Sequence, residues 1–120
     1  MSGKKVSWLK SCGAAWQGIV RTVKNERNGR LHLAATVLVI TAGFLSSLER
    51  WEWAAILLVI AFVWSTELIN TALETLLDRL HPEAHPLIGA AKDAAAGAVL
   101  VAALAAVLIG ILVFGPRLWF

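Results

Sequence analysis

Three long apolar runs, separated by short polar breaks, dominate the pattern of the chain. They cover residues 31–48, 53–77 and 94–115. The hydrocarbon core of a bilayer needs about 20 apolar residues of α-helix to cross it, so each run predicts a transmembrane helix, the first slightly short. The break between the first two runs is brief, and Trp51 and Trp53 mark a membrane boundary there, which predicts a tight hairpin between the first two spans. Gly115 and Pro116 are predicted to end the third span.

The segment 5–30 shows a different pattern, in which apolar and polar residues alternate at helical spacing. Its apolar members are Trp8, Leu9, Cys12, Trp16, Ile19, Val20 and Val23, and Lys10, Gln17, Arg21 and Lys24 form the opposite stripe. An interrupted apolar face with tryptophans and cations predicts an amphipathic helix lying at the membrane surface, followed by a polar turn. A helix that packs on its own protein would show the same periodicity.

Composition supports a membrane protein with a single domain, residues 1–120. The chain is 58% hydrophobic and 16% charged, with a mean hydropathy of +0.71. The fold class is therefore predicted to be all-α and integral to the membrane. Most of the excess of Lys and Arg precedes residue 31, without the aromatic interleaving of RNA-binding surfaces, so no nucleic-acid partner is expected. By the positive-inside rule, the N-terminus and the connection 78–93 are predicted to be cytoplasmic.

Polar residues interrupt the second apolar run on one side only. Glu67, Asn70 and Glu74 fall within roughly 60° of arc on a helix, so they form one stripe. A carboxylate at the bilayer centre costs about 2.5–3.5 kcal/mol on insertion scales. The stripe is therefore predicted to face protein, water or a metal ion, and it is the first candidate site.

The graded depth of these acids suggests a chemistry. Glu26 and Glu74 are predicted at the cytoplasmic surface, where carboxylates and the adjacent Lys92 and Asp93 can hold a divalent ion and a polyphosphate. Glu67, about 10 Å deeper, can accept a proton from a lipid hydroxyl. Phosphoryl transfer to a membrane alcohol fits this arrangement, but an ion- or proton-coupled transporter would explain an intramembrane Glu about as well. A purely structural bundle accounts less well for a shared acidic stripe.

Several motifs resemble one known family. The run Glu67-Leu-Ile-Asn70-Thr-Ala-Leu-Glu74, the later Asp78 and His85, and Ala91-Lys92-Asp93-Ala-Ala-Ala-Gly97 look like the signature of prokaryotic diacylglycerol kinases. The likeness extends to Ala15-Trp16-Gln17-Gly18 and Asn25-Glu26. It implies a homotrimeric bundle in the bacterial inner membrane, with an interfacial helix and three spans per subunit and active sites shared between subunits.

The resemblance also implies residue roles. Glu67 is similar to the family's catalytic base, with Asn70 positioning groups beside it, and Glu26 and Glu74 to carboxylates that hold magnesium on ATP. The expected nucleotide-binding residues are Lys92, Asp93, Glu83, Ala84 and His85. The expected contacts with the lipid substrate are Glu67, Arg30 and Trp16. ATP, Mg²⁺, a lipid alcohol and further copies of the chain are therefore the expected partners.

One segment favours a substrate. Residues 26–32, together with Glu52-Trp53, resemble the branch of the family that includes undecaprenol kinases. We therefore expect undecaprenol rather than diacylglycerol as the acceptor alcohol.

Overall fold

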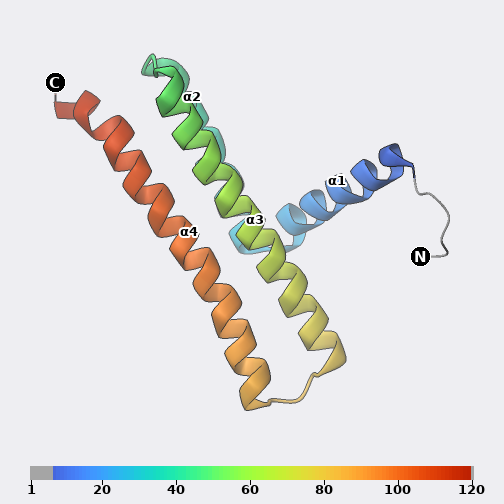
Figure 1. The fold of residues 1–120 in the computed structure, drawn as a ribbon. Helices are drawn as coiled ribbons and strands as arrows, with labels where there is room; N and C mark the ends of the chain where they lie inside the picture. Colours follow the sequence, from blue (N-terminus) through green and yellow to red (C-terminus); the bar gives the residue numbers. More distant parts are fainter. Residues whose placement is uncertain (1–6, 120) are drawn as a thin grey trace.

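The computed structural model describes residues 7–119 and shows four α-helices, with no strand in that part of the chain (Figure 1). They are α1 (Trp8–Asn25), α2 (Arg27–Leu45), α3 (Arg50–Leu80) and α4 (Pro86–Trp119). The helices α2, α3 and α4 are long and apolar enough to cross a membrane. The predicted layout of one amphipathic helix and three apolar helices is confirmed.

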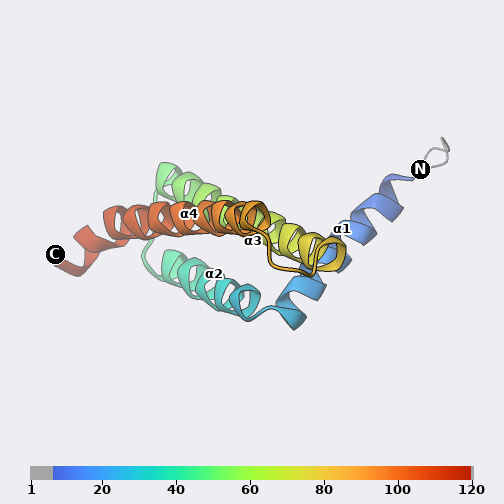
Figure 2. The same ribbon diagram turned by 90° about the horizontal axis from the view of Figure 1, so that it is seen from below.

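Helix α1 leaves the bundle at a steep angle, as Figures 1 and 2 show. Its start is capped by Ser7, whose Oγ accepts a hydrogen bond from the backbone N–H of Lys10 at 3.2 Å. Trp8, Leu9 and Trp16 are exposed along it. An amphipathic helix of this kind, projecting from apolar helices, is suited to the headgroup layer of a membrane.

The junction between α1 and α2 is tighter than the predicted polar turn. Only Glu26 interrupts the helices, with extended backbone angles of φ −112° and ψ 128°, and α2 begins at Arg27. Gly29 makes this possible, because a Cβ at this position would lie 2.7 Å from the carbonyl oxygen of Thr22. The predicted turn is thus mostly the first turn of α2. A helix can continue through polar residues that lie outside the hydrocarbon core, so the polarity of this segment did not indicate a loop.

The predicted hairpin between the first two spans is confirmed in α2 and α3. Its turn passes through Ser47, which adopts a left-handed conformation at φ 54°. The start of α3 carries a capping box, in which Glu49 and Glu52 each accept a hydrogen bond from the other's backbone N–H. Gly43 lets the hairpin close, because a Cβ there would meet the ring of Trp53 at 2.7 Å.

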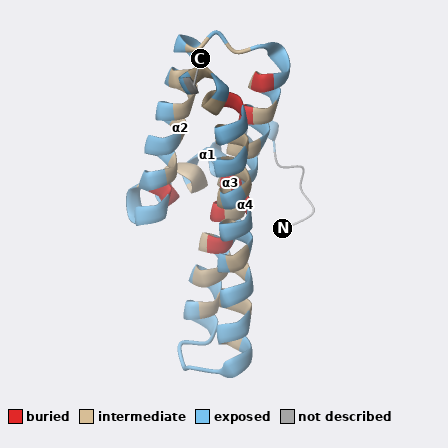
Figure 3. Ribbon diagram, turned by 90° about the vertical axis from the view of Figure 1, so that its left-hand side faces the viewer, coloured by how far each residue is buried: buried red, intermediate tan, exposed pale blue. Residues whose placement is uncertain are grey.

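Helix α3 is the centre of the fold. It contacts α1, α2 and α4, whereas α4 packs along α3 alone. The buried apolar core among the described residues is small and consists of Ile56, Val63, Ala102 and Val113. Nearly all other positions on α2, α3 and α4 are exposed or half-buried (Figure 3). A core this small requires a lipid environment or further protein around the exposed apolar side chains.

The helices extend further than the predicted spans. Residues 78–80 continue α3 and residues 86–93 open α4, so the predicted connection 78–93 shrinks to a loop at 81–85. Pro86 does not interrupt α4, because it is the first residue of that helix, where the N–H that proline lacks would be unpaired anyway. Pro116 was wrongly expected to end the last helix. It lies inside α4, near the end, where the loss of one backbone hydrogen bond is tolerated.

Candidate active site

The acidic stripe of α3 faces protein at its deeper positions, as predicted. Glu67 is 2% exposed and Asn70 is 7% exposed, while Glu74 is half-buried. They follow Ile56 and Val63 on the buried side of the helix. One face of α3 therefore packs through apolar side chains in the first half of the helix and presents the polar site in the second half.

Helix α2 supplies a partner for Glu67. Nε2 of His32 lies 3.5 Å from Oε2 of Glu67. This distance is long for a hydrogen bond, and Oε2 has no hydrogen-bond partner of ordinary geometry among the described residues. Oδ1 of Asn70 is likewise buried without a partner. The site thus holds two buried oxygens able to accept hydrogen bonds from a substrate or to coordinate a cation.

A second pair of residues fixes α2 against α3 beside this contact. The indole Nε1–H of Trp64 donates to Oγ1 of Thr36 at 2.9 Å, and the Thr36 hydroxyl donates to the carbonyl of His32 at 2.7 Å. The rings of His32 and Trp64 meet edge to face, with centroids 6.2 Å apart. The contact between His32 and Glu67 was not predicted from the sequence, because the two residues are 35 positions apart and their contact depends on how α2 is rotated.

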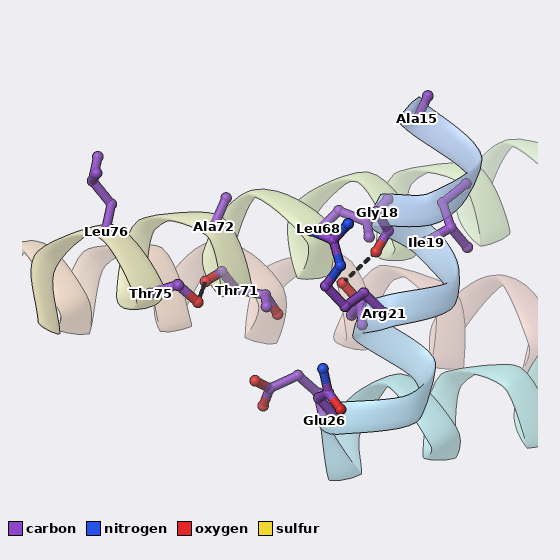
Figure 4. Close-up of a pocket in the computed structure, with 12 residues that line it drawn as sticks. Ala15, Gly18, Ile19, Arg21, Glu26, Leu68, Thr71, Ala72, Thr75 and Leu76 are labelled. Atoms are coloured by element: carbon purple, nitrogen blue, oxygen red, sulfur yellow. Dashed lines mark hydrogen bonds between the residues drawn. The ribbon is translucent and has the colours of Figure 1, made fainter. Parts of the chain in front are cut away.

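A groove of about 710 Å³ lies between α1 and α3, and none of Glu67, Asn70 and Glu74 lines it. Figure 4 shows α1 crossing α3 near Leu68, with Glu26 at the end of α1 where α2 begins. Half of the groove's twelve lining residues are apolar or glycine and half carry polar side chains: Ala15, Gly18, Ile19, Arg21, Thr22, Asn25, Glu26, Leu68, Thr71, Ala72, Thr75 and Leu76. A groove with both apolar and polar lining suits an amphiphilic ligand.

Trp16 and Arg30, which were also expected to contact the lipid substrate, lie outside the groove. Trp16 is 65% exposed and does not line the groove. Arg30 turns back onto α1, where its guanidinium donates to the carbonyl oxygens of Lys24 at 2.8 Å and Val23 at 3.4 Å. Within one chain, Arg30 therefore caps the end of α1.

The expected nucleotide-binding residues lie at the far end of α3 and the start of α4. Lys92 forms an ion pair across the two helices with Asp78, and Asp93 is exposed. Because α4 begins at Pro86, Asp93 lies two turns inside that helix.

Glu83, Ala84 and His85 occupy the exposed loop between α3 and α4. The ring of His85 meets that of His81 edge to face, with centroids 5.7 Å apart. Thirteen residues of α3 separate Glu67 from the end of the helix at Leu80, which is about 20 Å along its axis. A single chain therefore does not bring this loop together with Glu67.

The two carboxylates expected to hold a cation come from different elements, because Glu26 lies at the α1–α2 junction and Glu74 lies on α3. The charges of both act on Glu67. Residues 7–119 contain no cluster of three or more His, Cys, Asp or Glu side chains arranged around a single ion position. Two carboxylates fit Mg²⁺ only if phosphate oxygens and water complete its six ligands, which is how nucleotide-bound Mg²⁺ is usually held.

An ion pair at the opposite end of the bundle was not anticipated. The carboxylate of Glu52, 4% exposed, accepts hydrogen bonds from both terminal nitrogens of Arg117, at 2.5 and 2.6 Å. Arg117 also donates to the carbonyl of Ser46 at 3.1 Å. The available signal was one basic and one acidic residue at the same predicted end of two spans.

This chain is similar to proteins of a known family. A model of the family described as prokaryotic diacylglycerol kinase matches residues 13–114. An undecaprenol kinase of Bacillus subtilis is 46% identical over 79 residues, which cover 62% of this chain and 64% of that protein. A diacylglycerol kinase of Synechocystis is 43% identical over 70 residues, or 58% of this chain and 40% of that protein. The matched part thus spans less than two thirds of either relative, but the family model covers most of this chain, which belongs to the prokaryotic diacylglycerol kinase family.

Proposed function

We propose that this protein is a lipid kinase that transfers the γ-phosphate of ATP to the hydroxyl of a membrane alcohol, with undecaprenol as the favoured acceptor. The observation that carries the proposal is the buried carboxylate of Glu67, 2% exposed, within a helix that is long and apolar enough to span a membrane. Family membership and a relative named undecaprenol kinase support the same reaction.

The residues divide the work by depth. Glu67 accepts the proton of the lipid hydroxyl, and Asn70 holds groups around it through its unpartnered Oδ1. Glu26 and Glu74 hold Mg²⁺, which neutralises charge on the ATP phosphates when bound. Lys92, Asp93 and the loop residues Glu83, Ala84 and His85 bind the nucleotide. The protein contributes position and charge, since phosphoryl transfer of this kind needs little covalent participation.

The reaction requires more than one copy of the chain. The loop that binds nucleotide lies about 20 Å along α3 from Glu67 in one chain. A homotrimer, in which one subunit's loop meets another subunit's stripe, joins the two halves and covers exposed apolar faces. The enzyme then lies in the bacterial inner membrane, with its N-terminus and the α3–α4 loop on the cytoplasmic side, where ATP is available.

The test is transfer of labelled γ-phosphate by protein purified in micelles, offered a panel of undecaprenol and diacylglycerol. We expect phosphorylated undecaprenol as the main product, and Glu67→Gln to lower kcat by at least about a hundredfold, the usual weight of a general base. Glu49→Gln is the matched control, because Glu49 lies at the other end of α3 and its amide can still accept hydrogen bonds.

Two results would contradict the proposal. Normal turnover by Glu67→Gln removes Glu67 from the base role. Ion or proton flux in proteoliposomes that needs no ATP, with no phosphorylated lipid, identifies the acidic stripe as part of a transporter.

A further inference from the structure

The contact between His32 and Glu67 joins two helices inside the apolar part of the protein. His32 is 19% exposed in its side chain and Glu67 is 2% exposed. Of the basic side chains in residues 7–118, only that of His32 lies within 4 Å of the Glu67 carboxylate. The other charged groups that act on Glu67 are the carboxylates of Glu26 and Glu74, which repel it. Among the basic side chains of residues 7–118, His32 is therefore the one placed to donate a hydrogen bond to this carboxylate and offset that repulsion.

The segment of α2 that carries His32 is itself fixed against α3. Thr36, one turn further along α2, receives the indole N–H of Trp64 and donates to the His32 carbonyl. Trp64 also presents its ring to the edge of the imidazole. Trp64 and Glu67 are three residues apart on α3, so the same face of α3 both anchors α2 and carries the carboxylate. These contacts place the His32 backbone beside the carboxylate of Glu67.

We infer that His32 is a positioning residue for Glu67: its Nε2–H holds one carboxylate oxygen, so that the other is presented to the hydroxyl of the lipid substrate. The inference rests on the proposed lipid kinase activity and adds to it a specific orienting group. The present 3.5 Å separation shortens in the substrate complex, because contacts in active sites often tighten when the ligand binds. A carboxylate displaced by an ångström costs on the order of a hundredfold in rate, so its orientation carries weight.

The contact is tested first without any activity. Side-chain ¹⁵N shifts of the three histidines are measured in detergent for the parent and for Glu67→Gln. We expect the Nε2 shift of His32 to move, and the shifts of His81 and His85, in the distant loop, to remain. An unchanged His32 shift overturns the inference whatever the enzyme does.

The positioning role is tested by kinetics at saturating ATP and lipid. His32→Phe keeps a ring against Trp64 but removes the donor, and we expect kcat to fall by at least about tenfold with the KM for ATP unchanged. His32→Gln returns an N–H near the Nε2 position and restores most of the rate. In the Glu67→Gln background, His32→Phe changes the residual rate by less than about twofold, because the group it orients is gone.

The outcomes separate the two claims. If the parent phosphorylates the lipids and His32→Phe keeps the parental kcat, or if Gln rescues no better than Phe, the positioning role is wrong while the kinase stands. If the parent phosphorylates no lipid at all, the proposed function fails, and the positioning role fails with it even where the ¹⁵N shift shows the contact.

Discussion

An ion pair lies near each end of α3. At one end, Glu52 and Arg117 form a two-point hydrogen-bonded ion pair that also reaches the carbonyl of Ser46. At the other, Lys92 pairs with Asp78. Glu52 is buried whereas the Arg117 side chain is 31% exposed, so removal of Arg117 leaves a buried carboxylate without its counterion. The pair therefore stabilises the register of α4 on α3.

We expect Arg117→Gln and Glu52→Gln each to lower the denaturant midpoint of unfolding in micelles. Both remove a charge and leave its partner behind, whereas the double variant leaves no uncompensated charge. Its loss should therefore be smaller than the sum of the two single losses, as measured by circular dichroism in a double-mutant cycle. Strictly additive losses would show that the two side chains act independently in solution.

Gly29 decides how closely α1 approaches α2. A Cβ at this position meets backbone atoms of Thr22 and Val23, which cannot move without shifting the junction. Glu26 lies at that junction, so the position of the carboxylate proposed to bind the cation depends on it. A one-carbon change therefore tests whether the elements are joined as the structure shows.

We expect Gly29→Ala to destabilise the protein by about 1–3 kcal/mol, the usual range for overpacking, and to weaken binding of the magnesium–ATP complex. Gly89→Ala is the matched control, since a Cβ there meets nothing within 4 Å and alanine is the better helix former. Unfolding in denaturant and nucleotide titration measure both effects. Equal behaviour of the two variants would show that the junction is looser than described.

The sequence predicted which segments form the long helices, but not where each helix ends. The three apolar runs predicted α2, α3 and α4 correctly because hydropathy reports where a helix can meet lipid. It does not report where a helix ends in water, so residues 78–80 and 86–93 were missed as helix. The spacing of Glu67 and Asn70 predicted their burial, because periodicity within one helix fixes which side chains share a face. The contact of His32 with Glu67 depends on the rotation of one helix about another, which local periodicity does not contain.

At the scale of the whole molecule, the small core shows that the exposed apolar faces need lipid or further protein to cover them. Large apolar side chains remain exposed along all three long helices, including Leu38, Leu58 and Leu112. Lipid covers some of these, and neighbouring copies are proposed to cover the rest. The orientation of the molecule in the membrane then decides whether the acidic site can meet ATP.

The single cysteine, Cys12, lies on the apolar stripe of α1, so the test of that orientation uses Lys10→Cys on the polar stripe in a Cys12→Ser background. A maleimide that cannot cross membranes should label this variant in inverted inner-membrane vesicles and leave it unlabelled in intact spheroplasts. Cys12→Ser combined with Arg50→Cys, at the opposite end of the bundle, should show the reverse pattern. Labelling of the Lys10→Cys variant from outside would place the N-terminus, and the expected ATP site, on the wrong side.

The length of α3 makes the bilayer itself part of the catalytic geometry. Its 31 residues extend about 46 Å, against a hydrocarbon thickness of about 30 Å. If Glu52 and its partner mark one boundary, the other falls near Ala72, with Glu67 about 7 Å inside it and Glu74 just beyond. Turnover should therefore peak in vesicles of matching acyl length. It should decline in thicker ones, which draw Glu74 and the Mg²⁺ proposed to bind there into the hydrocarbon core. A flat response across an acyl-chain series would show that the protein sets these depths without help from the lipid.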